Sequence, residues 1–521
     1  MISTLAHSLR LVRAGYVLAR EGVFGLVDPA ALPPSARFGL RIARIFERPK
    51  AATRNRLPAA LTALGPTYVK LGQFLATRQD IVGLALSRDL EALQDRMPPF
   101  PQAQAEAIVA QALDRPLADV FTSFGPAVAA ASIAQVHRAQ TQDGRTVAVK
   151  VLRPGAAQRL RTDLAAFYFA ARRAEAWSAE ARRLRLIEVV DTLARSVAIE
   201  MDLRLEAAAL SEMAENTRDD PDFRVPAVDW NLTGKDVLTL EWIEGTPLTD
   251  RAALAAKGYD LPQLGRIVIQ SFLRHAMRDG FFHADMHPGN LFVDGDGKLV
   301  AVDFGIMGRL GPKERRFLAE ILHGFITRDY LRTAQVHFDA GYVPPQHSVE
   351  AFAQAIRAIG EPIHNRTAED ISMAKLLTLL FEVTSLFDMK TRPELLLLQK
   401  TMVVVEGVAR TLDPRLDMWS TSAPVVREWM ARNLGPAGRL EDAATSLGEV
   451  GSFLGQVPGL LIRAGRIADQ LDAATRDGIA LAPETVAAIG NAEARRSRAT
   501  AAALWTIAGL LLILTVGLFL S

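Results

Sequence analysis

The sequence predicts an α+β fold in which a small strand-rich lobe comes before a larger and mainly helical lobe. Within residues 136–153, two short strand patterns flank the turn QDG as in a β-hairpin, and a third strand pattern covers 236–245. Helical periodicity then dominates from about 248 to 440. Only two short strand patterns, 291–293 and 298–302, interrupt it.

Composition narrows the class of protein. A chain of 521 residues can bury a large core and should divide into more than one structural unit. The 60 Lys and Arg residues nearly balance the 58 Asp and Glu residues, which argues against a nucleic-acid binder with a wholly basic surface. The absence of cysteine excludes disulfides, thiolate nucleophiles and Cys-ligated zinc. Because the charges are balanced, we expect no nucleic-acid partner.

The chain divides into six segments by its periodicity and its breaks. Its first residues form an amphipathic helical pattern, which Arg10, Arg13 and Arg20 interrupt before any apolar run reaches the length of a signal peptide. The expected units are an N-terminal helical segment (1–60), a helical extension (61–124), a strand-rich lobe (125–246), a helical lobe (247–440), a helical linker (441–498) and an uncharged terminal helix (499–521).

Within the stretch FFHADMHPGNLFVDGDGKLVAVDFG (281–305), Asp285 is followed five residues later by Asn290 and thirteen residues after that by Asp303. Asp285 and Asn290 lie on the loop before a short strand, and Asp303 follows the next strand inside an Asp-Phe-Gly sequence. This is the arrangement of the catalytic and metal loops of protein kinases. We assign Asp285 the catalytic-loop role. Asn290 and Asp303 are expected to bind Mg²⁺, which takes one or two carboxylates together with the phosphate oxygens of ATP.

Two other interpretations of this stretch are weaker. DGDG suggests a calcium loop, but Lys298 stands where a ligand is expected and no Gly falls at the sixth place. His283 and His287, four residues apart, would bind zinc from one face of a helix. Because Pro288 and Gly289 disfavour a helix there, hydrogen-bonded structural histidines are the better interpretation.

Kinase-type chemistry also needs a lysine that reaches the α- and β-phosphates from a strand. In TVAVKVLRP, the alternation of a strand places Val147, Val149 and Val151 on one face. Lys150 lies on the other face and can point into a cleft. A lysine facing solvent on an edge strand is the alternative.

A glutamate on a helix should hold that lysine in place. The helical pattern at 196–210 offers Glu200, Asp202 and Glu206. In a continuous helix Asp202 and Glu206 share one face and Glu200 lies on nearly the opposite side, so the acids should have different partners. For any one of them, a solvated helix face is the alternative.

Two further segments are candidates for nucleotide binding. In LTLEWIEG (238–245), Glu241 to Ile243 are expected against the adenine edge, although a plain buried strand explains the pattern equally well. In GPAVAAASIAQVH (125–137), alanines stand where a protein kinase has glycines over the phosphates. We expect a stiffer phosphate-covering loop there. Its residues are Ala129, Ala130, Ala131 and Ser132.

Together these motifs resemble the UbiB family, the atypical kinase-like proteins of ubiquinone biosynthesis. The motifs occur in order over roughly residues 60–310. They are KLGQ (70–73), AAASIAQVH (129–137), VAVKVLRP (147–154), EMD (200–202) with Glu206, HADMHPGN (283–290) and VDFG (302–305). The resemblance implies a bilobal protein-kinase-like fold with an N-terminal helical extension across the active site. Met286 departs from the family, which usually has Pro at this position.

The resemblance also implies roles. Lys70 and Gln73 on the extension would meet Glu200 and Asp202 and restrain access, and Glu206 would pair with Lys150. The expected protein is an ATP- and Mg²⁺-binding ATPase or small-molecule kinase. Its expected partners are membrane lipid, quinone precursors and the enzymes of ubiquinone biosynthesis. Self-association as a homodimer is a further expectation. A true protein kinase and a nucleotide-sensing, lipid-binding scaffold are the competing hypotheses.

Residues 499–521 carry no charge. As a helix they would span about 35 Å, which is enough for a hydrocarbon core of about 30 Å. Arg495, Arg496 and Arg498 immediately precede them, so the positive-inside rule keeps the catalytic domain in the cytoplasm. We expect a single-pass C-terminal transmembrane helix in the inner membrane.

Overall fold

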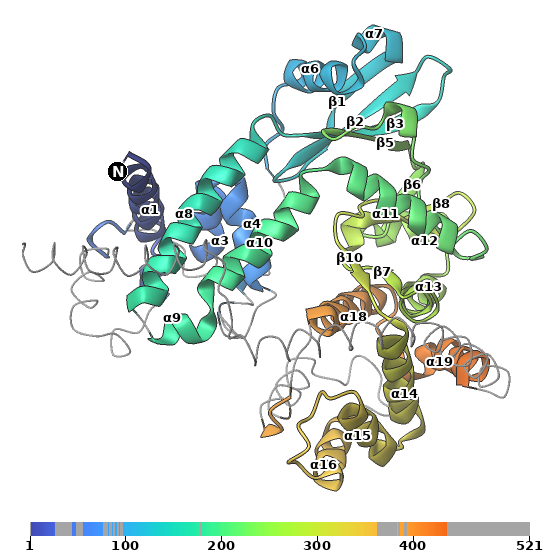
Figure 1. The fold of residues 1–521 in the computed structure, drawn as a ribbon. Helices are drawn as coiled ribbons and strands as arrows, with labels where there is room; N and C mark the ends of the chain where they lie inside the picture. Colours follow the sequence, from blue (N-terminus) through green and yellow to red (C-terminus); the bar gives the residue numbers. More distant parts are fainter. Residues whose placement is uncertain are drawn as a thin grey trace, which may run out of the picture. The chain divides into compact units, whose positions relative to one another are not determined.

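The computed structural model describes residues 2–26, 44–47, 56–76, 97–177, 179–361, 386–389 and 393–434, together with positions 82, 86, 89, 90, 93 and 383. The chain divides into two units, residues 1–432 and 433–521, and nearly all of the described residues belong to the first. The architecture below is that of the first unit (Figure 1).

An antiparallel sheet forms the strand-rich lobe (Figure 1). Its strands, in spatial order, are β1 (Phe121–Ala130), β2 (Ala134–Thr141), β3 (Thr146–Leu152) and β5 (Val237–Glu241). The predicted hairpin is confirmed by β2 and β3. Val147, Val149 and Val151 of β3 are buried, and they pack in one cluster with Ala105 and Val109 of α6 (Gln102–Leu113). The alternation of β3 therefore leaves Lys150 on the face away from α6.

A helical layer adjoins this sheet and includes the N-terminal helices. Its members are α1 (Ile2–Arg20), η1 (Val23–Leu26), α3 (Arg56–Leu64), α4 (Pro66–Ala76), α8 (Ala156–Trp177), α9 (Ala179–Leu184) and α10 (Leu186–Glu200). Helix α8 contacts α1, α4 and α10. The segment 61–124 thus serves two layers, because α4 packs in this one, whereas α6 and the short α7 (Leu117–Val120) pack against the sheet.

The chain breaks between α10 and α11 (Leu203–Asn216), so the prediction of one continuous helix over 196–210 is wrong. Asp202 has extended dihedral angles, and its carboxylate accepts a hydrogen bond from the backbone NH of Arg204. An Asp that caps a helix N-terminus stabilises a new start better than it stabilises a helix interior. Glu200 and Glu206 therefore belong to different helices, and the argument from a shared helix face does not apply.

Two small sheets form the strand part of the larger lobe. One has the order β4 (Phe223–Arg224), β9 (Leu299–Ala301), β8 (Leu291–Asp294), β6 (Gly245–Pro247), and the other pairs β10 (Met307–Arg309) with β7 (Phe281–His283). The short strands predicted at 291–293 and 298–302 are confirmed as β8 and β9. The strand predicted over 236–245 is split, because β5 pairs with β3 and β6 pairs with β8. Residues 242–244 connect the two sheets.

The rest of the larger lobe is helical. Its helices are α12 (Arg251–Ala256), α13 (Leu261–Arg274), α14 (Pro312–Thr327), α15 (Tyr330–Asp339), α16 (Val349–Gly360), α18 (Pro393–Leu412) and α19 (Met418–Leu434). Between α13 and β7, His275–Asp279 form a π-helical turn that ends at Gly280 with a left-handed φ of 65°. Such turns are frequent near functional sites. This one delivers the chain into β7 and the loop that holds Asp285.

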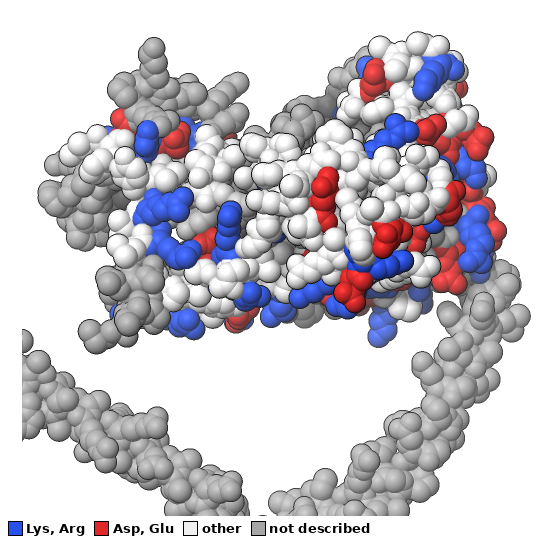
Figure 2. All heavy atoms as spheres, turned by 90° about the horizontal axis from the view of Figure 1, so that it is seen from above, with Lys and Arg blue, Asp and Glu red and all other residues white. Residues whose placement is uncertain are grey.

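The surface mixes charges of both signs. Figure 2 shows Lys and Arg side chains interspersed with Asp and Glu side chains, with wide uncharged areas between them. In the part of the chain that the structure describes, no helix combines the length and hydropathy needed to cross a bilayer. The expected membrane span at 499–521 lies outside these residues.

Candidate active site

Lys150 is the centre of the candidate site. Its Nζ lies 2.7 and 2.9 Å from the two carboxylate oxygens of Glu206 on α11 and 3.3 Å from Oδ1 of Asp303. The side chains of Lys150 and Glu206 are only 17% and 8% exposed, whereas that of Asp303 is 47% exposed. The structure thus contains the Lys150–Glu206 pair that the resemblance implies, and it adds Asp303 to it.

Lys150 and its two carboxylate neighbours, Glu206 and Asp303, have opposite charges and favour one another's ionised forms. Burial by itself lowers the pKa of Lys150, but the adjacent Asp303 and Glu206 carboxylates outweigh it and raise this pKa. Partial removal from water raises the pKa of Asp303, yet the Lys150 ammonium and the backbone NH of Gly305 hold it at about 2. Burial also raises the pKa of Glu206, and Lys150 opposes that shift. Near neutral pH the lysine is a cation and Asp303 is a carboxylate.

The Asp-Phe-Gly sequence is fixed to the helix that carries Glu206. The backbone NH of Phe304 donates to Glu206 Oε1 at 3.4 Å, and the NH of Gly305 donates to Asp303 Oδ1 at 3.1 Å. The Phe304 side chain is buried, and its ring centroid lies 4.9 Å from that of His283. These contacts aim the Asp303 carboxylate at Lys150 while its neighbour anchors in the core.

Backbone pairing brings Asp285, Asn290 and Asp303 to one end of the small sheets. The NH of Ala284 donates to the carbonyl of Ile306, which places Asp285 beside the segment that follows Asp303. The NH of Val302 donates to the carbonyl of Asn290. Asn290 Nδ2 donates to the carbonyl of Asp285 at 3.2 Å, so its amide oxygen is the atom suited to a metal.

An Mg²⁺ ion at this site would need oxygen atoms from its ligand. The described residues contain no group of three or more His, Cys, Asp or Glu side chains arranged to hold a metal. One ionised carboxylate, Asp303, and one amide oxygen, Asn290, fit the usual pattern in which Mg²⁺ also binds phosphate oxygens and water. The residues present therefore suit a metal that arrives with a triphosphate.

The two histidines of the loop have structural bonds, as predicted. His283 is buried, and its Nδ1 accepts a hydrogen bond from the NH of Asp285 at 3.0 Å. Burial lowers the pKa of His283, which keeps the ring neutral and able to accept that bond. His287 is exposed, and its Nδ1 accepts from the NH of Gly289 at 3.1 Å. Both rings shape the loop around Asp285.

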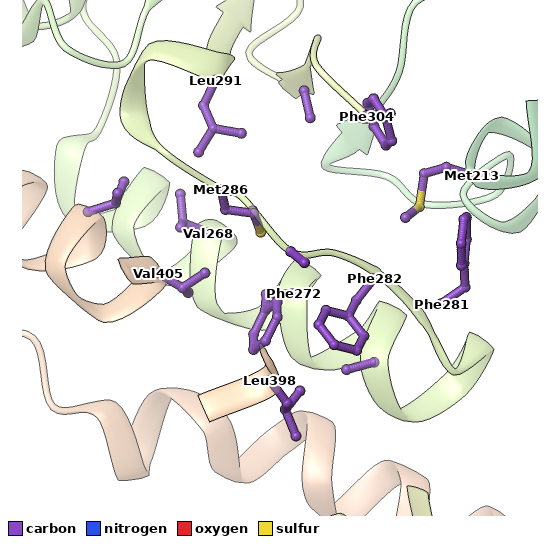
Figure 3. Close-up of a cluster of buried hydrophobic side chains, with 14 of the residues drawn as sticks. Met213, Val268, Phe272, Phe281, Phe282, Met286, Leu291, Phe304, Leu398 and Val405 are labelled. Carbon is purple, nitrogen blue, oxygen red and sulfur yellow. The ribbon is translucent and has the colours of Figure 1, made fainter. Parts of the chain in front are cut away.

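The loop also has a buried floor that the sequence did not reveal. Met286 is 1% exposed and lies beside Val268 in the cluster that Figure 3 shows, with Phe272 and Val405 nearby. Thr401 of α18, fully buried, donates to the carbonyl of Ala284 at 3.1 Å. Helix α18 lies more than a hundred residues away in the chain, and no local pattern indicates this contact.

The alanine segment ends β1 and turns into β2. Ala129 and Ala130 are the last residues of β1, and the backbone NH of Ala131 donates to the carbonyl of Ala134 at 2.8 Å. Arg153 braces the turn, because its Nε donates to the Ala131 carbonyl at 2.9 Å. Ser132 at the turn is fully buried. The sequence did not indicate this contact of Arg153, because only the fold brings it to this turn.

Part of the segment expected against an adenine edge is already bound to other protein groups. The Glu241 carboxylate forms an ion pair with Arg224 at 3.1 Å and accepts from the NH of Ala227 at 3.2 Å. The backbone NH of Glu241 donates to the carbonyl of Ala227. The Glu241 side chain is thus bound to protein, and a base would have to meet its main chain. Ile243, half-buried, lies in the connection between β5 and β6.

The N-terminal extension meets one of its two expected acids. Lys70 of α4 lies 2.6 Å from Glu200 Oε2, and both side chains are nearly buried at 12% and 10% exposure. Asp202 instead binds the Arg204 guanidinium at 2.6 and 2.8 Å while it caps α11. Gln73 lies on α4, half-buried, three residues beyond Lys70.

Comparison with known proteins identifies the family. A family model of the ABC1 atypical kinase-like domain matches residues 92–337, and one of the UbiB helical domain matches residues 356–417. "Probable protein kinase UbiB" of Marinobacter nauticus is 40% identical over 84% of this chain and 81% of its own length. The protein of the same name in Azotobacter vinelandii is 42% identical over 77% and 75%. The chain belongs to the UbiB family.

A solved structure supports the fold that this membership implies. The complex of Rv3197 with erythromycin from Mycobacterium tuberculosis matches 75% of this chain and 97% of its own, with a TM-score of 0.50 and 24% identity. The kinase-like ABC1 fold expected for a UbiB protein is therefore present. The UbiB helical domain begins within α16 and includes α18, whose Thr401 contacts the loop of Asp285.

Proposed function

We propose that the protein binds ATP with Mg²⁺ between the sheet of Lys150 and the β8–β9 hairpin, and that it hydrolyses or transfers the γ-phosphoryl group. The contacts of Lys150 Nζ with both Glu206 and Asp303 carry this proposal. They join a cation on one sheet to a carboxylate beside the other, which is the pairing that phosphates and their metal require.

Each residue has a role in this proposal. Lys150 binds the α- and β-phosphates, and Glu206 keeps its ammonium in position. Asp303 and Asn290 bind Mg²⁺, which when present offsets the negative charge of the phosphate oxygens. Asp285, exposed on its loop, orients the attacking hydroxyl or water and accepts its proton.

The remaining nucleotide contacts follow from the two segments around the sheet. The end of β1 at Ala129 and Ala130 and the turn at Ala131 and Ser132 cover the phosphates, and Arg153 fixes the shape of the turn. Ile243 and the main chain of Glu241 contact the base. Alanines in place of glycines restrict the turn, which favours one phosphate geometry over others.

The proposed acceptor is water or a small molecule rather than a protein. Support comes from α4, which lies directly behind the alanine turn, since Lys70, Ile133 and Arg153 line one common cavity. The Lys70–Glu200 pair holds α4 to α10 at this place. An extension fixed there narrows the approach to the cleft. Lys70 and Gln73 of α4, with Glu200 of α10, are the proposed access-restraining residues, whereas Asp202 caps α11 and binds Arg204.

We place this activity in ubiquinone biosynthesis at a membrane. The support is the kinship with UbiB proteins and the uncharged stretch 499–521, which would anchor the chain in the inner membrane with the ATP site in the cytoplasm. Membrane lipid, quinone precursors and the enzymes that modify the quinone ring are the proposed partners, and self-association as a homodimer is a further one. A quinone precursor is too apolar to leave the bilayer, so an anchored enzyme would meet it there.

The test is ATP turnover by the purified full chain, with and without phospholipid vesicles and a small alkylphenol as precursor mimic. Asp303→Asn is expected to abolish turnover, and cells that carry it should lose ubiquinone and accumulate precursors. Asp296→Asn, an exposed carboxylate in the β8–β9 turn, is the matched control and should retain both. Normal quinone levels without turnover would instead indicate a non-catalytic scaffold.

A protein-kinase activity is the second candidate, because the relatives carry the printed name "Probable protein kinase UbiB". It requires that a polypeptide reach Asp285 past α4. Robust phosphorylation of a purified protein in trans by the wild-type chain, lost in Asp303→Asn, would favour it over a small acceptor.

A further inference from the structure

The outer side of α1 carries large apolar side chains in contact with solvent. Leu9, Val12 and Tyr16 are 61%, 68% and 47% exposed, and their spacing of three and four residues places them on one side of the helix. Ile45 and Phe46 extend this surface at 77% and 52% exposure, with the rings of Phe46 and Tyr16 5.9 Å apart, edge to face. We call these five side chains the α1 face.

The clustering is unusual for this molecule. Among the described residues, twelve large apolar side chains are markedly exposed, and five of them belong to the α1 face. Single exposed apolar side chains are normal on proteins, but a contiguous group marks an interaction surface. The α1 face is therefore expected to have a partner.

The same side of α1 is cationic. Arg13 and Arg20 are exposed and lie one helical turn beyond Leu9 and Tyr16, and neither forms an ion pair with a described residue. The helix sequence ISTLAHSLRLVRAGYVLAR contains no acidic residue. Large apolar side chains beside unpaired arginines are the composition of a helix that lies in a membrane interface.

The opposite side of α1 fixes its orientation. Ala14, on that side, is buried, and Arg10 forms an ion pair with Asp163 of α8 at 3.0 Å. Helix α1 also contacts α3. The α1 face is thus presented outward by a docked helix.

We propose that the α1 face binds the surface of an anionic phospholipid membrane. Its apolar side chains would enter the boundary between head groups and acyl chains, while Arg13 and Arg20 meet lipid phosphates. A second copy of the chain is the weaker candidate, because a two-fold interface would set these arginines against their own copies with no acid on α1 to pair with them. The α1 face consists of described residues, and its binding to the membrane depends neither on ATP nor on residues 499–521.

The absence of cysteine permits a direct test on the full chain. In one variant, Val12→Cys carries a nitroxide label. In the matched control, Val128→Cys on β1, where the side chain is 54% exposed, carries the same label. Both proteins are reconstituted in vesicles of phosphatidylcholine alone or with phosphatidylglycerol. Collisions with oxygen and with a water-soluble nickel chelate then report the phase around each label.

With phosphatidylglycerol, the Val12 label is expected to collide more with oxygen than with the chelate, and the Val128 label more with the chelate. The double variant Arg13→Glu with Arg20→Glu should weaken the binding of the α1 face to lipid about thirtyfold or more. Raised salt should weaken the same binding to a smaller degree. Because each label reports its own surroundings, anchoring elsewhere in the chain does not produce the result.

Three outcomes would overturn the proposal. One is a Val12 label that stays in water in both kinds of vesicle. Another is lipid contact of the Val12 label that is the same with and without phosphatidylglycerol and is unchanged by the double arginine variant. The third is a Val12 label shielded from both reagents without vesicles, to a degree that rises with protein concentration, which would identify the α1 face as an interface between copies.

Discussion

Two buried lysine–glutamate pairs lie on either side of the break between α10 and α11. Lys70 meets Glu200 at 2.6 Å at the end of α10, and Lys150 meets Glu206 at 2.7 Å at the start of α11. All four side chains are less than one-fifth exposed. Distance and burial alone do not distinguish the two pairs.

Their surroundings do distinguish them. Lys150 also lies 3.3 Å from Asp303, and Glu206 also accepts from the NH of Phe304, so this pair is continuous with the candidate metal loop. Glu200 instead joins α10 to α4 of the N-terminal extension. The first pair thus lies beside the proposed metal-binding residue, and the second holds two helices together. Similar ion pairs therefore acquire different roles from what they connect.

The largest expected effect comes from Lys150→Met. We expect ATP turnover to fall at least about 100-fold, because the phosphates lose their preorganised cation. The free energy of unfolding should fall by about 3 to 5 kcal/mol, since Glu206 is left buried without its partner. Steady-state turnover and urea unfolding measure the two effects.

The double variant Lys150→Met with Glu206→Leu separates stability from activity. Replacing both charges by apolar groups should restore most of the stability but none of the turnover. If turnover returned with stability, the pair would be structural, and the distinction from Lys70–Glu200 would disappear.

Lys70→Ala should cost a comparable but smaller amount of stability, about 3 kcal/mol, because it also leaves a nearly buried carboxylate unpaired. Turnover should change rather than vanish, and autophosphorylation should become detectable as the extension loosens. Turnover assays and intact-mass measurement report these changes, with Lys70→Ala plus Glu200→Ala as the control for the unpaired charge. Wild-type kinetics in every assay would show that α4 does not restrain access.

The far end of α11 provides a third comparison. Past its last turn, Asp220 is 4% exposed and accepts from His275 Nε2 at 3.0 Å and from Arg278 at 2.6 Å. Arg278 also donates to the carbonyl of Asn216. Helix α11 is therefore held at both ends, by Lys150 near its start and by this network near its end.

Acid pH should weaken that second attachment. Burial raises the pKa of Asp220, but His275 and Arg278 outweigh it and hold the pKa at about 2, below its usual value of 3.8. The carboxylate thus stabilises the fold above about pH 4 and loses that effect as the pH falls toward 2, a difference of about 2 kcal/mol. Asp220→Asn should flatten this part of the acid-unfolding curve, whereas the exposed neighbour Asp219→Asn should not. Equal curves for all three proteins would refute the assignment.

The smallest effect is expected at the alanine turn. Ala131→Gly should shift the ratio of ATP to ADP affinity by about two- to fivefold, because glycine frees the backbone by about 0.5 to 1 kcal/mol where it covers the phosphates. Calorimetric titration with each nucleotide measures the ratio, and Ala127→Gly within β1 is the matched control. An unchanged ratio in both Ala130→Gly and Ala131→Gly would remove the turn from the nucleotide site.

Much of the candidate site was readable from local spacing. The intervals between Asp285, Asn290 and Asp303 predicted a loop, a hairpin and a second loop, and the strands β8 and β9 are present between them. The alternation around Lys150 predicted its face correctly, since the valines beside it are buried. Such patterns are legible because a strand alternates every two residues and a hairpin closes over a short loop.

Other features depended on partners far away in the chain. The sequence alone favoured one helix through 196–210, and it gave no sign that Arg224 would take the carboxylate of Glu241 or that Thr401 would brace Ala284. These contacts join residues 17 to 117 positions apart. No periodicity of a single segment records them.

The sequence by itself determined which residues have the right chemistry, namely a lysine on a strand, two carboxylates and an amide around a hairpin, and a family likeness. Only the tertiary structure decided that Lys150 meets Glu206 and Asp303 together, that Asp202 caps a helix rather than meeting α4, and that one side of α1 stays exposed. The physical reason is that chemistry belongs to side chains and local geometry to short segments. Burial and ion pairing are properties of the packed chain, because each depends on which distant segments remove a group from water.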